Sequence, residues 1–415
     1  MGTGHETAKL AFPLVLLMAL LVGVVTGLIV ALYYLVAISL VWRRSLPALF
    51  APGAVLVFPA AALFFAGLVL WFLARGDVLQ GSESVVEDYR VGAAGIDLEV
   101  APWKVASSVL VVGLGGSAGI SNPSIYAGGS IAEYFYRILG IDPKDTESFK
   151  AILMAGAAAG MAAAFRAPLA ATLLAMELPL KKAYSVKLAA PALISSLASY
   201  AIAASALGMQ PLVPVRTIGG FTFSDVISAA AVGLICGSIG RLYVILYGMV
   251  KTAFEESRVA LYVKTLLGGL AAGFAAFFGF IFSGTPYVLG IGYDALRPTV
   301  ELAYSPVVLV FLVFLKAVAT VSTLGSGAFG GMIEPLVLMG AGTGAAWAGA
   351  VPLGSPSLVS IAGMAGFFSA AYKVPLASAV LAVELTRAPS ALVPTLAASL
   401  AAWAVSGSDS VLKRR

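Results

Sequence analysis

Long apolar stretches with few charges recur along the whole chain. A helix needs about 20 predominantly apolar residues to cross a bilayer, and several stretches reach that length. They lie at residues 10–42, 53–74, 186–208, 225–250, 262–283, 305–323 and 388–405. Other apolar stretches are interrupted by Gly and Pro, so we expect roughly ten to fourteen helical segments, several of them short or re-entrant.

The composition points to the same class of protein. The chain has 415 residues, of which 60% are hydrophobic and 11% charged, whereas about a quarter of a soluble domain is charged. We therefore predict an all-α, polytopic protein that is integral to the lipid bilayer. The chain ends in Lys413, Arg414 and Arg415, which favours a cytoplasmic C-terminus over a contact with nucleic acid.

Few residues are suited to catalysis or metal binding. Cys236 is the one cysteine and His5 the one histidine, so a disulfide within the chain and a thiolate metal site have no ligands. No nucleophile and base stand out as a pair. We expect no metal, no cofactor and no enzymatic activity.

One segment occurs twice. Residues 155–178 (AGAAAGMAAAFRAPLAATLLAMEL) and 362–385 (AGMAGFFSAAYKVPLASAVLAVEL) are identical at 12 of 24 positions. Gly119–Pro123 (GISNP) and Gly331–Pro335 (GMIEP) also share the pattern Gly-x-x-x-Pro. Duplicated membrane units with broken helices are typical of secondary transporters, whose substrates bind near the middle of the membrane.

The duplication sets the expected domain organisation. We divide the chain into an N-terminal tail (1–9), a first membrane repeat (10–208), a linker (209–224), a second membrane repeat (225–407) and a C-terminal tail (408–415). An odd number of spans in each half would make the repeats inverted. The apolar boundaries do not fix that number.

Four breaks containing Gly or Pro precede apolar helices. They lie at residues 81–85 (GSESV), 119–123, 166–169 and 331–335. The first N–H groups of a helix have no acceptor within it and carry the positive end of its dipole, so converging helix starts can bind an anion. The alternative is structural, because small residues also let membrane helices pack closely.

Taken together, these motifs resemble those of the CLC chloride channels and transporters. The likeness covers residues 75–405 and is most specific in 155–178, in Gly119–Pro123 with Gly128, and in Gly331–Pro335 followed by LxxxGAGTG. It implies two inverted repeats, a homodimer with an anion pathway in each subunit, chloride as ligand, and the plasma membrane of a prokaryote. It also indicates a member that has only the membrane domain.

The resemblance also implies which residues contact the anion. Ser82 corresponds to the family's anion-binding serine, and the N–H groups of Met332 and Ile333 to its donors in the second half. The helix starts add Gly119, Ile120, Ser121, Asn122, Gly331 and Glu334. For Ser82 and Ser84 the alternative is an N-cap of a helix that starts near Val85. Ser410-Val411-Leu412 stand where the family has a tyrosine, which predicts a less occluded inner side.

Two departures from the family concern protons. Ser121 occupies the position of the family's gating glutamate, and Leu178 that of its internal proton glutamate. Neither side chain can carry a proton as a carboxylate does. We therefore predict passive, channel-like movement of chloride or a similar monovalent anion, without proton coupling.

The alternative is a proton-coupled antiporter that uses Glu334 or Glu177. Glu334 is either an acid in favourable interaction with its own helix dipole or a displaced gate that competes with anions for the same N–H groups. Glu177 has a twin in Glu384, which favours a shared structural role at a helix end. The physiological anion, the direction of flow, and channel versus slow uncoupled transport stay open.

Further residues carry weaker predictions. Arg166 and its twin Lys373 either attract anions to a pore mouth or extend toward the membrane surface. Trp42, Trp71 and Trp103 are expected to anchor the protein at the membrane interface.

Overall fold

The computed structural model describes residues 10–141, 145–179, 185–215 and 219–412. The predictions for the tail 1–9, for His5 and for the basic residues Lys413, Arg414 and Arg415 lie outside these ranges. Within them the regular structure is helical, apart from one isolated bridge between two residues. The predicted all-α class is confirmed.

Seven helices within the described residues are long and apolar enough to cross a membrane. The first begins as α1 (Phe12–Tyr34) and continues through a π-helical turn to Ser45. The others are α3 (Pro52–Phe72), α7 (Thr146–Phe165), α9 (Val186–Leu207), α10 (Phe223–Glu256), α11 (Leu261–Ser283) and α13 (Pro306–Gly325). Six of the seven predicted stretches are found among them.

The seventh prediction, a span at 388–405, is wrong in length. A 3₁₀ turn occupies Pro389–Ala391, and α17 (Leu392–Val405) has only 14 residues. The spanning helix α7 is absent from the predicted set, because the sequence shows it only as the front of the duplicated block. A break after Phe165 separates α7 from the next helix.

The remaining helices are shorter. They are α4 (Gly81–Val91), α5 (Ala101–Gly113), α6 (Ser121–Ile138), α8 (Pro168–Glu177), α12 (Tyr293–Val300), α14 (Ile333–Ala350), α15 (Pro356–Tyr372) and α16 (Pro375–Thr386). The described residues hold more helical segments than the expected ten to fourteen, because the Gly and Pro breaks end helices instead of only bending them.

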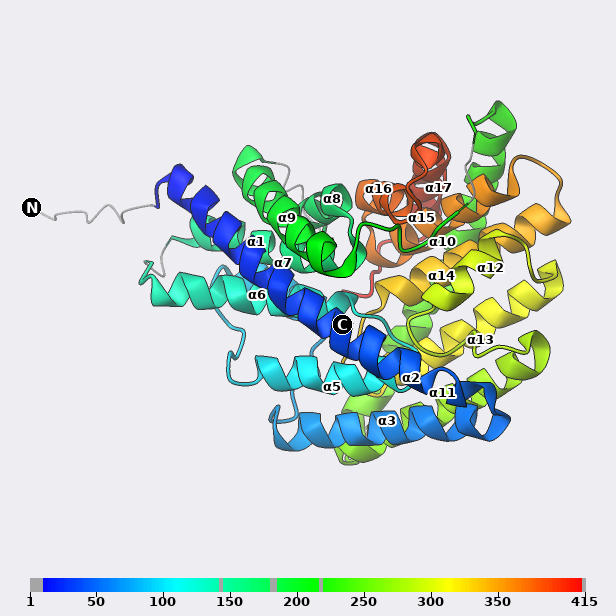
Figure 1. The fold of residues 1–415 in the computed structure, drawn as a ribbon, viewed down its shortest axis with the longest axis horizontal. Helices are drawn as coiled ribbons and strands as arrows, with labels where there is room; N and C mark the ends of the chain where they lie inside the picture. The colour runs from blue at the N-terminus through cyan, green and yellow to red at the C-terminus, as the bar shows by residue number, and fades with distance from the viewer. Residues whose placement is uncertain (1–9, 142–144, 180–184, 216–218, 413–415) are drawn as a thin grey trace, which may run out of the picture.

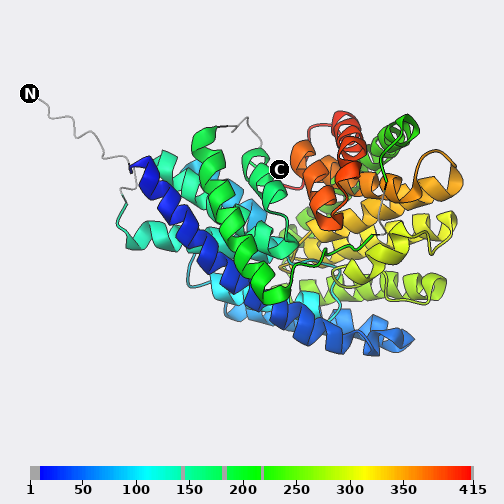
Figure 2. The same cartoon turned by 45° about the horizontal axis from the view of Figure 1, so that its top comes forward.

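The two halves are related as inverted repeats. α6 and α14 have the same length and begin at equivalent positions of the two repeats. α8 and α16 also begin at equivalent positions. α8 and α16 lie side by side between the two halves (Figures 1 and 2). The Glu177 carboxylate at the end of α8 accepts from the N–H groups of Leu376 and Ala377, 3.3 and 2.8 Å away, at the start of α16.

The equivalent contact runs the other way. The Glu384 carboxylate near the end of α16 accepts from the N–H groups of Leu169 and Ala170, 3.1 and 2.8 Å away, at the start of α8. Each helix therefore ends where its twin begins, so the two run antiparallel. Equivalent segments can pair in this way only when the halves have opposite directions, which is the inverted arrangement that the resemblance implies.

Apolar side chains cover the outer faces of the spanning helices. Leu32 is 62% exposed, Phe72 69% and Val307 81%. Water would make such surfaces costly, but lipid tails do not. The protein is thus an integral, multi-pass membrane protein.

Candidate anion site where the two repeats meet

The two Gly-x-x-x-Pro motifs meet at their first residues. The Gly119 N–H donates to the Gly331 carbonyl over 2.7 Å, and the Gly331 N–H donates to the Gly119 carbonyl over 2.6 Å. A Cβ on Gly119 would lie 2.0 Å from Oε2 of Glu334, and one on Gly331 would lie 2.3 Å from Oγ of Ser121. Gly331 leaves no room for a side chain because the backbone nitrogen of Ser121 would also lie 2.6 Å from that Cβ, whereas at Gly119 the Cβ would meet only the end of the Glu334 side chain.

The Glu334 carboxylate occupies the helix start of the other repeat. Its Oε1 accepts from the Ile120 N–H over 2.8 Å, and its Oε2 accepts from Oγ of Ser121 over 2.7 Å. The N–H groups of Ser121 and of Glu334 itself also bond it. The side chain is 1% exposed. A negative group thus already lies on the donors that the sequence predicts for an anion.

Ser82 lies on another side of the same meeting point. α4 begins at Gly81 with Gln80 as N-cap, so the alternative for Ser82 and Ser84, an N-cap of a helix that starts near Val85, is wrong. Oγ of Ser82 donates to Oδ1 of Asn122 over 2.8 Å, and Nδ2 of Asn122 donates to the Gly330 carbonyl over 3.0 Å. Ser82 is 1% exposed, so its hydroxyl belongs to a buried polar chain.

Tyr372 is a site residue that the sequence did not reveal. It ends α15, is buried, and hydrogen-bonds the Ser82 side chain with its hydroxyl. Tyr372 stands in the duplicated block where the first copy has Phe165. That difference between the copies is the signal that could have identified it.

The C-terminal residues pack beside Tyr372. The Val411 N–H donates to the Ala371 carbonyl over 3.1 Å, and Val411 and Leu412 are buried. These residues therefore pack against the end of α15, and the less occluded inner side expected from Ser410-Val411-Leu412 stays a prediction. Tyr372 approaches Ser82 from within the repeat instead of from the tail.

The repeats also share a buried lysine, which could not be picked out from the sequence. Lys104 in α5 and Lys316 in α13 have the same sequence separation as Gly119 and Gly331, and neither is exposed. Nζ of Lys104 donates to Oδ2 of Asp77 and to the Leu79 carbonyl, both over 2.8 Å. Nζ of Lys316 donates to the Val288 and Gly290 carbonyls, both over 2.9 Å.

Lys316 also interacts electrostatically with Glu334. Each lysine binds the turn before a short helix, α4 or α12, and thereby holds that helix against its repeat. Positive charge buried near the meeting point favours an anion there.

The two positions of the family's proton glutamates hold no carboxylate. Ser121 opens α6, and Leu178 is 1% exposed after the end of α8. Its neighbour Glu177 is bonded to the start of α16, which agrees with the structural role predicted for the twin glutamates.

Arg166 and Lys373 are each tied to carbonyl oxygens of the protein. Nη1 of Arg166 donates to the Gln210 carbonyl over 2.8 Å, and Nζ of Lys373 donates to the Ser406 carbonyl over 3.0 Å. Both residues have left-handed backbone angles, with φ of 53° and 65°. These bonds hold both side chains against the protein and leave the two alternatives for them as predictions.

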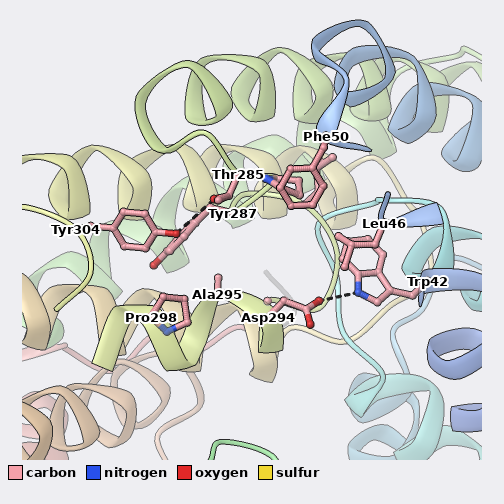
Figure 3. A pocket seen from close by; sticks show the side chains of 12 residues that line it. Trp42, Leu46, Phe50, Thr285, Tyr287, Asp294, Ala295, Pro298 and Tyr304 are labelled. Atoms are coloured by element: carbon pink, nitrogen blue, oxygen red, sulfur yellow. Dashed lines mark hydrogen bonds between the residues drawn. The ribbon is translucent and has the colours of Figure 1, made fainter. Parts of the chain in front are cut away.

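A small pocket of about 130 Å³ beside α12 is a poor place for an anion (Figure 3). Its lining includes Tyr287 and Tyr304, and its one carboxylate, Asp294, accepts from Nε1 of Trp42 over 2.8 Å. Trp42 is 4% exposed, so the prediction that it anchors the protein at the interface is wrong. Trp71 and Trp103 are 45% and 44% exposed, as anchors would be.

A family model decides the identity of the fold. The model described as voltage-gated chloride channel matches residues 61–407. The chain belongs to the CLC family. Its membership accounts for the inverted repeats and for anion transport as the general function.

Curated relatives share about a quarter of their aligned residues with this chain. The H(+)/Cl(-) exchange transporter ClcA of Vibrio campbellii is 26% identical over 94% of this chain and 85% of its own length. A putative chloride channel protein ClcB-like of Ralstonia nicotianae is 26% identical over 86% and 84%. An uncharacterized protein of Methanocaldococcus jannaschii is 27% identical over 68% of both chains.

Solved CLC structures share the fold. A slow cyanobacterial Cl−/H+ antiporter superposes with a TM-score of 0.83 at 21% identity, covering 96% of each chain. A CLC-type fluoride/proton antiporter gives 0.81 at 22% identity, covering 96% of this chain and 97% of the other. The Vibrio campbellii protein and both solved structures are named as exchangers or antiporters of an anion and protons. These three names give no support to the predicted passive channel.

Proposed function

We propose that this CLC-family protein exchanges chloride or a similar monovalent anion for protons, with Glu334 as gate and proton carrier. The observation that carries the proposal is the position of the Glu334 carboxylate on the N–H groups of Ile120 and Ser121, supplied by the other repeat. These donors are the ones an anion would use.

Charge explains how such a gate works. The ionised carboxylate holds the donors at the start of α6 and excludes another anion from them. When Glu334 takes up a proton it loses its charge, and a chloride ion then competes better for the Ile120 and Ser121 N–H groups. The first N–H groups of α14, at Met332 and Ile333, have no acceptor within their helix and are proposed to complete the site.

A proton must also reach Glu334 from the other side of the membrane. Leu178 cannot carry it. A chain of polar side chains leads toward Glu334 instead: Tyr372 bonds Ser82, Ser82 bonds Asn122, and Asn122 adjoins Ser121, which bonds Glu334. In the proposal these polar groups surround the route by which the proton reaches Glu334, and Ser82 and Asn122 also face the anion.

Passive anion movement is the second candidate. Its support is the lack of a carboxylate at both Ser121 and Leu178, the family's two proton positions. In that case Glu334 would gate the pathway without linking anions to protons. Gly119 and Gly331 have the same role in both candidates, since they keep the two helix starts together.

Flux in liposomes separates the two candidates. Wild-type protein with a chloride gradient and no other ion pathway is expected to drive protons against their own gradient. Glu334→Gln is expected to keep chloride flux and to lose the proton movement. Glu99→Gln, at a side chain that is 80% exposed, is the matched control and should behave as wild type. Chloride flux without proton movement in wild type would replace the exchanger by the passive candidate.

The remaining parts of the proposal come from the family resemblance. They are a homodimer, chloride as the ligand, and no cofactor and no enzymatic activity. Light scattering of the detergent-solubilised chain would show a dimer or overturn that part without affecting the proposed transport.

A further inference from the structure

The pocket beside α12 differs from the anion site in the chemistry of its walls (Figure 3). The lining residues that the structure describes include the carboxylate of Asp294 but no lysine, arginine or histidine. The aromatic lining residues come from both repeats and are Trp42, Phe50, Tyr287 and Tyr304. No lining residue belongs to the site around Glu334, so the pocket is a separate feature of the molecule.

Two of the rings form adjoining walls. The centres of the Tyr287 and Tyr304 rings lie 5.7 Å apart, and the ring planes meet at 88°. Oγ1 of Thr299 donates to the Tyr287 hydroxyl over 3.2 Å. Oγ1 of Thr285 lies 3.4 Å from the Tyr304 hydroxyl and is hydrogen-bonded to it. These bonds at the hydroxyl ends hold both rings in place.

The carboxylate of the pocket is also held in place. Asp294 is the second residue of α12, and Trp42 ends the π-helical turn of the first span, Leu35–Trp42. Nε1 of the buried Trp42 donates to Oδ2 of Asp294 over 2.8 Å. Oδ1 of Asp294 accepts no hydrogen bond from the described part of the chain. A negative group with an unused oxygen therefore lies at the pocket.

The positive charges of this region are directed elsewhere. Nζ of Lys316 donates to the Val288 and Gly290 carbonyls, both over 2.9 Å. Nε of Arg297 donates to Oε1 of Glu301 over 3.2 Å. Neither of these cations lines the pocket, so the formal charge of its described lining is negative.

Aromatic rings beside a carboxylate suit a particular kind of cation. The face of an aromatic ring attracts a cation within about 6 Å of its centre, and groups of such rings recognise quaternary ammonium ions. A primary ammonium has three N–H donors that require acceptors, whereas aromatic and aliphatic side chains dominate this lining. The volume of about 130 Å³ accommodates a ligand of several heavy atoms, since a water molecule takes up about 30 Å³ in the liquid.

We propose that this pocket binds a small methylated ammonium ion, with its methyl groups against the rings of Phe50, Tyr287 and Tyr304 and its charge beside Asp294. The ligand contacts both repeats, because Phe50 belongs to the first and the other three residues to the second. This site goes beyond the proposed exchange of anions and protons and does not depend on it.

Tetramethylammonium is the probe that tests the site. The full chain in detergent is titrated by calorimetry with tetramethylammonium chloride, which replaces sodium chloride so that chloride and ionic strength stay constant. Saturable binding of one ion per chain is expected. Asp294→Asn keeps the shape of the side chain and removes its charge, so the dissociation constant should rise at least about tenfold, a loss of about 1.4 kcal/mol or more.

Two further variants accompany this measurement. Tyr304→Leu replaces one aromatic wall by an aliphatic side chain, and the dissociation constant should rise about threefold to tenfold. Asp97→Asn is the matched control, because it removes a carboxylate that does not line the pocket. It should bind tetramethylammonium as wild type does. An equal loss of affinity in Asp97→Asn and Asp294→Asn would mean that only the overall charge of the protein matters, and would overturn the site.

Three other solutes test the class of ligand. tert-Butanol has a similar shape and no charge, methylammonium has N–H donors, and sodium is a cation without methyl groups. Each should bind at least about tenfold more weakly than tetramethylammonium. Equal binding of tert-butanol would reduce the site to an apolar hollow, and tighter binding of methylammonium would overturn the methylated ligand. Wild type without saturable tetramethylammonium binding would overturn the whole proposal.

A second measurement covers variants that do not fold. A ligand that binds only the folded chain raises its melting temperature, so tetramethylammonium should stabilise wild type more than sodium does at equal chloride. Phe50→Ala shortens a side chain that is 50% exposed and is expected to fold, and it should lose most of this stabilisation. Binding in a chain that exchanges no anions would remove the proposed function and leave this site standing. Exchange without binding would remove only the site.

Discussion

The starts of α6 and α14 have the same backbone, occupy equivalent places in the two repeats, and do opposite things. At the start of α6, Asn122 is neutral and bonds Ser82 and Gly330, so it places no carboxylate on the first N–H groups of α14. At the start of α14 the equivalent residue, Glu334, supplies a carboxylate that takes the donors at the start of α6. One repeat thus provides the donors and the other the competing anion.

The twin glutamates, in contrast to Asn122 and Glu334, have the same role in both repeats. Glu177 and Glu384 make equivalent bonds to the starts of α16 and α8, so both copies kept one structural role. The comparison teaches that the repeats stay alike where they hold each other together. They diverge at the residues that face the proposed pathway.

The largest expected effect comes from making the two helix starts alike. Asn122→Glu would place a second carboxylate near the N–H groups of Met332 and Ile333, just as Glu334 lies on those of Ile120 and Ser121. With both sets of donors occupied, chloride flux into liposomes should fall at least about tenfold near neutral pH, a loss of about 1.4 kcal/mol or more. Acidification should restore part of it, because a protonated carboxyl no longer competes as an anion.

Asn122→Gln is the control, since it has the length of glutamate and no charge. It should keep most of the flux. Wild-type rates in Asn122→Glu would mean that the α14 donors lie outside the pathway, and the proposed division between the two helix starts would then fail.

The next largest effect concerns the contacts that both repeats share. Glu177→Ala and Glu384→Ala each remove an acceptor from two N–H groups at a helix start, and each should destabilise the fold by about 1–3 kcal/mol. Thermal unfolding in detergent should show similar losses for the two variants, with proton coupling kept by the folded fraction. Coupling lost only in Glu177→Ala would instead identify Glu177 as a proton carrier.

Much of the fold could be predicted from the sequence. Spans such as 53–74 and 262–283 were found within a few residues, because an uninterrupted apolar stretch of about 20 residues is typical of a helix that crosses the bilayer. The start of α4 was misplaced because Gly81 looks like a helix breaker. In the structure, Gln80 bonds the Ala328 carbonyl of the other repeat and allows the helix to begin there.

The site was only partly predictable for a related reason. The motif at Gly119–Pro123 and its twin located the meeting point, and Glu334 stood out as a charge at a helix start. Tyr372 could not be assigned, because its bond to Ser82 joins residues far apart in sequence. Whether the N–H groups at the start of α6 or those at the start of α14 are free depends on contacts between the repeats. Local sequence patterns do not contain these contacts.

A smaller effect tests Tyr372 against its twin position, where Phe165 has no hydroxyl. Tyr372→Phe removes the bond to Ser82 and should raise the chloride concentration for half-maximal flux about threefold, since one neutral hydrogen bond contributes roughly 0.5–1.5 kcal/mol. Tyr287→Phe, which loses its bond to Thr299, serves as control and should leave the value unchanged. An equal shift in both variants would indicate a general loss of packing.

The smallest effect concerns a carboxyl group that only the first repeat buries. Glu133 in α6 is 1% exposed, whereas the equivalent residue of α14 is Ala345. α6 is not one of the seven spanning helices, and burial raises the pKa of Glu133 to about 7, against the opposing effect of Arg137 and with a further rise from Asp88. The N–H of Ile96 also bonds this carboxylate.

The sign of the pH effect follows from that raised pKa. The folded chain keeps the Glu133 proton at pH values where the unfolded chain has released it, near pH 4.3. The resulting stabilisation is complete below about pH 4.3 and is lost as the pH rises through about 7. Glu133→Gln lacks this dependence, so the melting temperature of wild type minus that of the variant should fall by about 1–2 °C between pH 4.5 and 7.5. A difference that stays constant over this range would show that the pKa of Glu133 is the same in the folded and unfolded chains, so that burying it in only one repeat has no pH-dependent consequence for stability.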